Sequence, residues 1–158
     1  MSEVVNLFDQ PRAADDDDPV GFEVPYARIG PLIGASALGM TVYELNEGNS
    51  ICPYHWESPE EEWLIVLEGR ATLRTPAGEQ ELGPWDCAFF PAGEEGAHKV
   101  TNNTDEPIRV CIWSNRNAVG VAVYPDSDKV GAWPPGKLFR LTDAVDYWDG
   151  EVPPDQSE

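Results

Sequence analysis

Short apolar runs, separated by turn-forming residues, follow one another from residue 22 to residue 114. Within several runs apolar and polar side chains alternate, which is the period of a strand with one buried face. No segment before residue 140 has the period of an amphipathic helix. The pattern therefore predicts nine strands, at Phe22–Ile29, Leu38–Leu45, Cys52–Glu57, Glu62–Leu67, Ala71–Thr75, Glu79–Leu82, Cys87–Phe90, His98–Thr101 and Ile108–Ser114.

The pattern changes after residue 114, where proline and glycine become frequent. Two further short strands are predicted at Val119–Tyr124 and Lys137–Leu141. Thr142 is a residue type favoured at helix N-caps. We therefore expect one brief helix from Thr142 to Tyr147 or Trp148.

Many short strands at regular spacing favour an all-β fold, here a single antiparallel β-barrel or jelly roll with a short C-terminal extension. We expect a flexible acidic leader at residues 1–20, the barrel at 21–115 and the extension at 116–158. Trp133 and Trp148 in the extension are expected to pack on the barrel or on a partner chain. Because open sheet edges and exposed aromatic side chains need cover, we expect a homodimer.

Acidic residues outnumber basic residues by 29 to 10, which gives a formal charge of −19. Such a field repels phosphate backbones, so we expect no nucleic-acid partner. The sequence has no apolar run of about 18 residues, so no membrane span is expected. The first residues lack the basic start and apolar stretch of a signal peptide, which favours a cytoplasmic protein. The run Asp15–Asp18 is interpreted as part of a solvated tail.

One of the two histidines, His55, lies in a predicted strand together with Glu57. Residues two apart in a strand share a face, so these two side chains are expected to point the same way. In the next strand Glu62 shares a face with Leu64 and Val66. If that face is interior, a carboxylate lies at one end of an apolar wall, where a cation or a proton must compensate its burial.

The second histidine, His98, follows a loop rich in glycine and proline, 43 residues beyond His55. Two imidazoles with one or two carboxylates suit a divalent first-row metal ion such as manganese, iron(II) or zinc. The strand period brings His55 and Glu57 together, but it does not by itself bring His98 to them.

Two segments carry a longer pattern of glycines and potential ligands. The first contains Gly48, His55-Trp56-Glu57, Glu62 and Gly69, and the second contains Trp85-Asp86, Pro91-Ala92-Gly93, His98 and Asn102. In this order they resemble the two conserved motifs of the cupin family, over about residues 36–115. The resemblance implies a β-barrel with one metal site, whose ligand positions correspond to His55, Glu57, Glu62 and His98.

The sequence departs from the cupin pattern at several positions. Glu57 stands where the family has its second histidine, and Trp85 stands at a turn glycine. The spacings before His55 and before His98 are one and two residues longer than usual. Three roles are open for Glu57: a metal ligand, a catalytic general base beside a three-ligand site, or a carboxylate facing solvent at the pocket mouth.

The resemblance implies a metal-binding protein and favours an enzyme that acts on a small organic substrate, of the oxygenase, isomerase, decarboxylase or lyase type. Two alternatives stay open: a cupin that binds a small molecule without catalysis, and a metal-free acid–base enzyme. The family alone does not select the reaction, because one fold hosts many functions.

Overall fold

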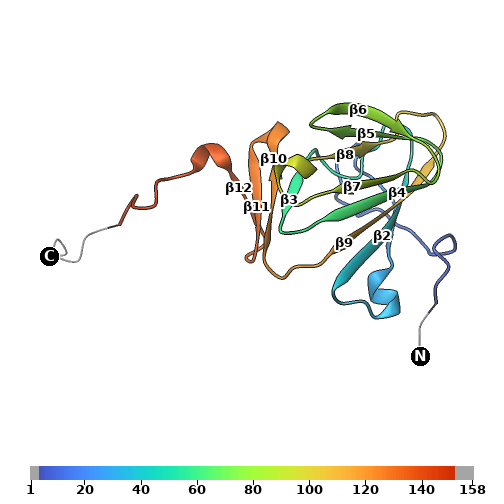
Figure 1. Ribbon diagram of the computed structural model, residues 1–158, viewed down its shortest axis with the longest axis horizontal. Coiled ribbons are helices and arrows are strands. Elements are labelled where there is room, and N and C mark those ends of the chain that lie inside the picture. The colour runs from blue at the N-terminus through green and yellow to red at the C-terminus, as the bar shows by residue number, and fades with distance from the viewer. Residues whose placement is uncertain (1–3, 152–158) are drawn as a thin grey trace.

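The computed structural model describes residues 4–151 and is built from strands and single turns of 3-10 helix (Figure 1). The strands are β1 (Tyr26–Arg28), β2 (Leu38–Leu45), β3 (Trp56–Ser58), β4 (Glu62–Glu68), β5 (Ala71–Thr75), β6 (Gly78–Leu82), β7 (Cys87–Phe90), β8 (Lys99–Thr101), β9 (Ile108–Asn115), β10 (Gly120–Tyr124), β11 (Lys129–Trp133) and β12 (Lys137–Arg140). The 3-10 turns are η1 (Gly30–Ile33), η2 (Glu94–Gly96), η3 (Pro125–Ser127) and η4 (Leu141–Asp143).

The strands form three antiparallel sheets, which confirms the predicted all-β fold. A five-stranded sheet has the order β1-β2-β9-β4-β7, and a three-stranded sheet has the order β6-β5-β8. A four-stranded sheet has the order β12-β11-β10-β3. It combines the last three strands with β3 and lies beside the other two sheets (Figure 1). No helix among residues 4–151 is long and apolar enough to cross a bilayer.

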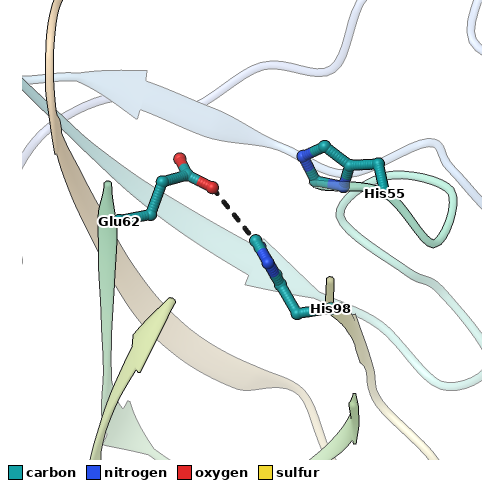
Figure 2. Close-up of side chains that lie close together, drawn as sticks. All are labelled: His55, Glu62 and His98. Carbon is teal, nitrogen blue, oxygen red and sulfur yellow. Dashed lines mark ion pairs between the residues drawn. The ribbon is translucent and has the colours of Figure 1, made fainter. Parts of the chain in front are cut away.

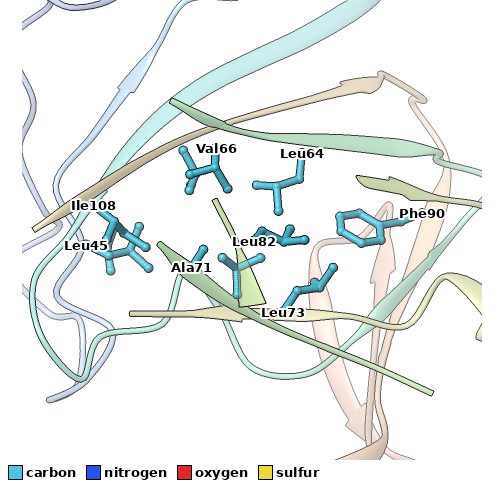
Figure 3. Close-up of a cluster of buried hydrophobic side chains, with 11 residues drawn as sticks. Leu45, Leu64, Val66, Ala71, Leu73, Leu82, Phe90 and Ile108 are labelled. Carbon is cyan, nitrogen blue, oxygen red and sulfur yellow. The ribbon is translucent and has the colours of Figure 1, made fainter. Parts of the chain in front are cut away.

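The main hydrophobic core lies between the five-stranded and the three-stranded sheets (Figure 3). Leu64 and Val66 of β4 are fully buried in it, together with Leu73 of β5 and Ile108 of β9. Because alternate residues of a strand share a face, Glu62 points to the same side of β4 as these two apolar residues. The predicted interior wall with a carboxylate at one end is confirmed.

The outer face of the five-stranded sheet is covered in part by the N-terminal leader. Val5 and Leu7 pack against a second apolar cluster on this face. Arg12 forms an ion pair with Glu44 of β2, at 3.2 Å. These contacts hold part of the leader along the sheet.

The extension after β9 differs from the prediction in two places. β11 was not predicted, and it pairs with both β10 and β12. The brief helix is a single 3-10 turn at Leu141–Asp143 that starts before Thr142 and ends well before Tyr147, because residues 144–151 continue in turns and irregular backbone. Every described residue from Lys137 onward is exposed, and the segment after β12 projects away from the sheets (Figure 1).

Candidate metal centre

Three side chains predicted as metal ligands lie together at one end of the core (Figure 2). One potential ligand atom from each of His55, Glu62 and His98 lies within 4.8 Å of the others. Glu62 begins β4, whereas His55 and His98 directly precede β3 and β8. The two histidines and the carboxylate therefore come from three different strands or their entrances.

The backbone holds the two histidines opposite each other. The N–H of His55 donates to the carbonyl oxygen of His98 at 3.1 Å, and the N–H of His98 donates to that of His55 at 2.8 Å. Directly opposed residues of an antiparallel pair point to the same face. This places the two imidazole centroids 4.9 Å apart and supplies the step that the strand period alone left open.

Hydrogen bonds to backbone carbonyls select the same tautomer for both rings. Nδ1 of His55 lies 3.1 Å from the oxygen of Pro53, and Nδ1 of His98 lies 2.9 Å from the oxygen of Gly96. A carbonyl oxygen only accepts, so the ring proton is assigned to Nδ1 in each case. Each Nε2 then carries a free lone pair, which is the arrangement of a metal-ligating histidine.

Aromatic side chains hold the rings in place. The His98 ring stacks on Phe90, with centroids 3.7 Å apart and planes at 6°. The His55 ring stacks on Tyr124, with centroids 5.8 Å apart. Phe90 is also the cross-strand partner of Glu62, so one aromatic residue borders two of the three candidate ligands.

Burial favours the neutral form of all three groups in the absence of a cation. Burial, and then the nearby His55, lowers the pKa of His98 to about 4. Burial, and then the nearby Glu60, raises the pKa of Glu62 to about 7. Between these values Oε2 of Glu62 and Nε2 of His98, 3.4 Å apart, are therefore an acid and a neutral imidazole rather than an ion pair. A divalent cation would bind the lone pairs of both atoms. This set of ligand atoms therefore fits a metal ion.

Glu57 of β3 lies beside this cluster and is not one of its members. Its Oε2 is buried and has no hydrogen-bond partner among the described residues. Burial, followed by the charges of Glu62 and Glu60, raises the pKa of Glu57. Glu57 lines a cavity of about 360 Å³ with Arg116 and Trp133 among the other lining residues.

Asn102, the last residue of the second motif, has a structural role. It is fully buried, and its amide nitrogen donates to the carbonyl oxygens of Leu45 and Glu106, both at 2.9 Å. Its Oδ1 accepts from the backbone N–H of Thr104 at 2.9 Å. The side chain fixes the turn between β8 and β9, as expected of an asparagine after a strand.

Sequence reasoning did not identify Tyr43, Tyr124 or Arg116 as neighbours of the site. Tyr43 is buried beside Cys52 and Glu62, and its pKa rises to about 12, mainly through burial. The sequence could have indicated Tyr43, because alternation from Leu45 places it on the interior face of β2. Tyr124 and Arg116 come after the core strands in the sequence and lie outside both segments of the cupin pattern.

Several solved structures are similar to this chain over most of its length. A sugar phosphate isomerase of the cupin superfamily from Silicibacter pomeroyi has 25% identity and a TM-score of 0.80, and the match covers 93% of this chain and 98% of that one. The polyketide cyclase RemF from Streptomyces resistomycificus has 24% identity and a TM-score of 0.60, with 73% and 80% covered. A Cupin 2 conserved barrel domain protein from Salinispora arenicola has 21% identity and a TM-score of 0.50, with 66% and 92% covered. A comparison with curated proteins finds no match.

The sequence profile of the cupin domain matches residues 41–114. This stretch contains His55, Glu62 and His98, together with the three-stranded sheet and most of the five-stranded sheet, whose strand β1 lies outside it. Family profile, fold and the placement of the two histidines agree with one another. The protein therefore contains a cupin domain over residues 41–114.

Proposed function

We propose that the protein is a metal-dependent enzyme of the isomerase or lyase type, acting on a small organic substrate. In this proposal His55, Glu62 and His98 hold a divalent metal ion, and Glu57 transfers a proton. The observation that carries it is the clustering of three potential ligand atoms within 4.8 Å, with both Nε2 lone pairs left free by the backbone.

The donor set favours manganese, iron(II) or zinc over soft metals, because it combines two imidazoles with a carboxylate and contains no thiolate. When bound, such an ion supplies Lewis-acid stabilisation of negative charge on a substrate oxygen. Phe90 and Tyr124 keep the imidazoles oriented and reduce the access of water to them.

Glu57 has the properties of a proton-transfer group. Its raised pKa brings the carboxyl closer to neutrality, where it can both accept and return a proton. In an aldose–ketose isomerisation it would take a proton from the hydroxyl-bearing carbon beside a carbonyl group and deliver it to the carbonyl carbon. The hydroxyl proton passes to the former carbonyl oxygen, and the C–H electron pair stays in the substrate. No oxidant or reductant is needed. The name of the Silicibacter relative, an isomerase of sugar phosphates, supports this reaction type.

The metal is tested first, without reference to activity. Protein purified without chelator is expected to contain about one divalent ion per chain by elemental analysis. His55→Ala, Glu62→Ala and His98→Ala are each expected to lose it. Glu61→Gln is the matched control, because Glu61 precedes Glu62 and is exposed. Wild-type protein that holds no divalent ion after metal reconstitution would refute metal dependence and favour the metal-free acid–base alternative.

The role of Glu57 is tested by proton exchange. Aldose and ketose phosphates are incubated with metal-loaded protein in D₂O, and deuterium entering the carbon-bound positions is followed by NMR. Glu57→Gln is expected to keep the metal and to lose exchange by about 100-fold or more. Loss of the metal in Glu57→Gln would instead assign Glu57 as a ligand. Absence of exchange with every substrate would favour the non-catalytic binding alternative.

A further inference from the structure

Arginine is mostly paired with carboxylates in this acidic protein. Three of the seven arginines, Arg28, Arg116 and Arg140, take part in no ion pair within the described part of the chain, although acidic residues outnumber basic ones by 29 to 10. The paired ones are Arg12 and Arg109 with Glu44, Arg70 with Glu81 and Arg74 with Asp126. Of the three without a partner, Arg28 and Arg116 line one cavity, whereas Arg140 lies on β12 (Lys137–Arg140).

Arg28 lies at the interior side of the five-stranded sheet. It is opposite Thr41 in the β1–β2 register, and its neighbour Ala27 packs into the cluster on the outer face. Arg28 therefore projects to the interior side, as Tyr26 and Tyr43 do. Its guanidinium carbon lies 5.3 Å from the centroid of the Tyr26 ring. Asp15 is nearby, but its carboxylate accepts hydrogen bonds from the Tyr26 hydroxyl at 3.1 and 3.2 Å.

Arg116 reaches the same side from the end of β9. Its backbone N–H donates to the carbonyl oxygen of Ala37 at 2.9 Å, which fixes its position beyond the strand. A Cβ atom added to Gly39 would lie 3.6 Å from both Cγ of Arg116 and Oγ of Ser114. The stem of Arg116 therefore lies over Gly39, in the cross-strand row that continues through Ser114 to Glu62. Glycine at position 39 leaves the space that this side chain uses.

The two arginines line one cavity, and Arg116 also lines the cavity of Glu57. The first cavity measures about 380 Å³ and includes Gly39 and Thr41 in its lining. The second measures about 360 Å³. Both arginines are exposed at the rim, so an incoming ligand can reach them. A molecule that spans from Arg28 to Glu57 would pass Arg116 on its way.

We propose that Arg28 and Arg116 form an anion-binding subsite at the rim of the metal centre, which selects substrates that carry a phosphate or a carboxylate group. The planar guanidinium binds such oxyanions through two parallel hydrogen bonds. The subsite also offers an anionic substrate a local attraction within a strongly negative protein. With its anionic group held there, the reacting end of the substrate faces Glu57 and Glu62. Assigning the bound anion to a substrate rests on the proposed function; the subsite itself does not.

The subsite is tested with inorganic phosphate and acetate as probes, titrated calorimetrically into metal-free full-length protein. Metal is removed so that the probes cannot bind to it. Arg28→Gln and Arg116→Gln are each expected to weaken phosphate binding about tenfold, and the double variant more. Arg140→Gln is the matched control, because Arg140 is also exposed and outside every ion pair but lies on β12. Stronger binding of phosphate would indicate a phosphomonoester, and stronger binding of acetate a carboxylate.

Absence of phosphate and acetate binding to the wild type, or equal binding by the wild type and the double variant, would overturn the proposal. A second measurement uses Mn²⁺-loaded protein, in which paramagnetic broadening of the ³¹P signal of phosphate reports proximity to the metal. The broadening is expected to decrease in the double variant and to persist in Arg140→Gln. A protein that binds no metal but binds phosphate through these arginines would refute the proposed function and leave the subsite intact.

Discussion

The two ends of the barrel interior share strand β4 and differ in what lines them. At one end the side chains of Leu45, Val66 and Ile108 are fully buried in the main hydrophobic core (Figure 3). At the other end, along the same face of β4, Glu62 meets two buried histidines. At both ends the alternation of a strand points side chains inward. The interior is apolar at one end and carries potential metal ligands at the other because of the residues at the strand ends and in the loops that join them.

The two ends also differ in the interactions that stabilise them. The apolar end depends on side-chain packing, whereas the metal end depends on backbone hydrogen bonds from its loops. Examples are the pair between His55 and His98 and the bond from the Gly93 N–H to the backbone carbonyl oxygen of Glu57 at 2.7 Å. Substitutions should therefore separate stability from metal binding, and the largest effects should appear where a loop backbone is forced to move.

Gly96→Ala is expected to damage the metal end most. A Cβ atom at Gly96 would lie 1.8 Å from the carbonyl oxygen of Pro91, so the loop must move, and with it the carbonyl that orients His98. We expect a loss of about 3 kcal/mol or more in unfolding free energy together with loss of the metal. Urea unfolding and elemental analysis measure both. Exposed Glu95→Ala in the same turn is the control, and a Gly96→Ala protein with normal metal content would contradict the mechanism.

Leu45→Ala tests the apolar end alone. Leu45 is fully buried, and its truncation leaves a cavity in the main core. We expect about 3 kcal/mol of destabilisation with unchanged metal content at temperatures where the protein stays folded. Exposed Glu47→Ala, two residues away, should change little. Loss of metal from folded Leu45→Ala protein would show that the two ends are coupled.

Trp85→Gly is expected to stabilise the turn between β6 and β7. Trp85 has φ +71° and is 74% exposed, so its backbone is strained and its ring contributes little packing. Glycine adopts this conformation without the Cβ clash, and the gain should be up to about 1 kcal/mol after its larger unfolded-state entropy is subtracted. Trp85→Ala keeps the strain and should give no gain. Thermal unfolding of the three proteins compares them directly.

The smallest effect concerns pH at the outer side of the apolar end. Hydrogen bonding to Arg109 holds the pKa of Glu44 below its usual value. A lowered folded-state pKa contributes stability that is present above the ordinary carboxyl pKa and is lost as the pH falls through the lowered one. Glu44→Gln should flatten this acid limb of the stability curve, by less than about 1 kcal/mol because the side chain is partly exposed. An unchanged acid limb in the variant would contradict the assignment.

The strand pattern predicted the core strands well, because their alternation is set by burial on one face. Glu62, Leu64 and Val66 were assigned to one face correctly for this reason. β11 was missed because it is not an alternating run: it contains Gly131, over which the Trp133 ring folds to within 2.6 Å of a hypothetical Cβ.

The site was predictable only in part. The period of a strand could bring His55 near Glu57, but only the pairing of two distant backbones brought His98 to His55. Arg28 lies on an alternating position of β1, so its side of the sheet could have been inferred, whereas Arg116 lies just beyond the end of β9. What the sequence could not supply was the absence of partner carboxylates, which depends on the folded neighbourhood of each arginine.

The mutual backbone bonds between His55 and His98 also bear on how quickly a metal ion would be captured. The ordering of both imidazoles takes place during folding, and stacking on Phe90 and Tyr124 keeps them from turning. An arriving cation would meet donors that are already aligned, so its rate of uptake should depend on shedding its own water shell and on passage through the rim rather than on any rearrangement of the chain.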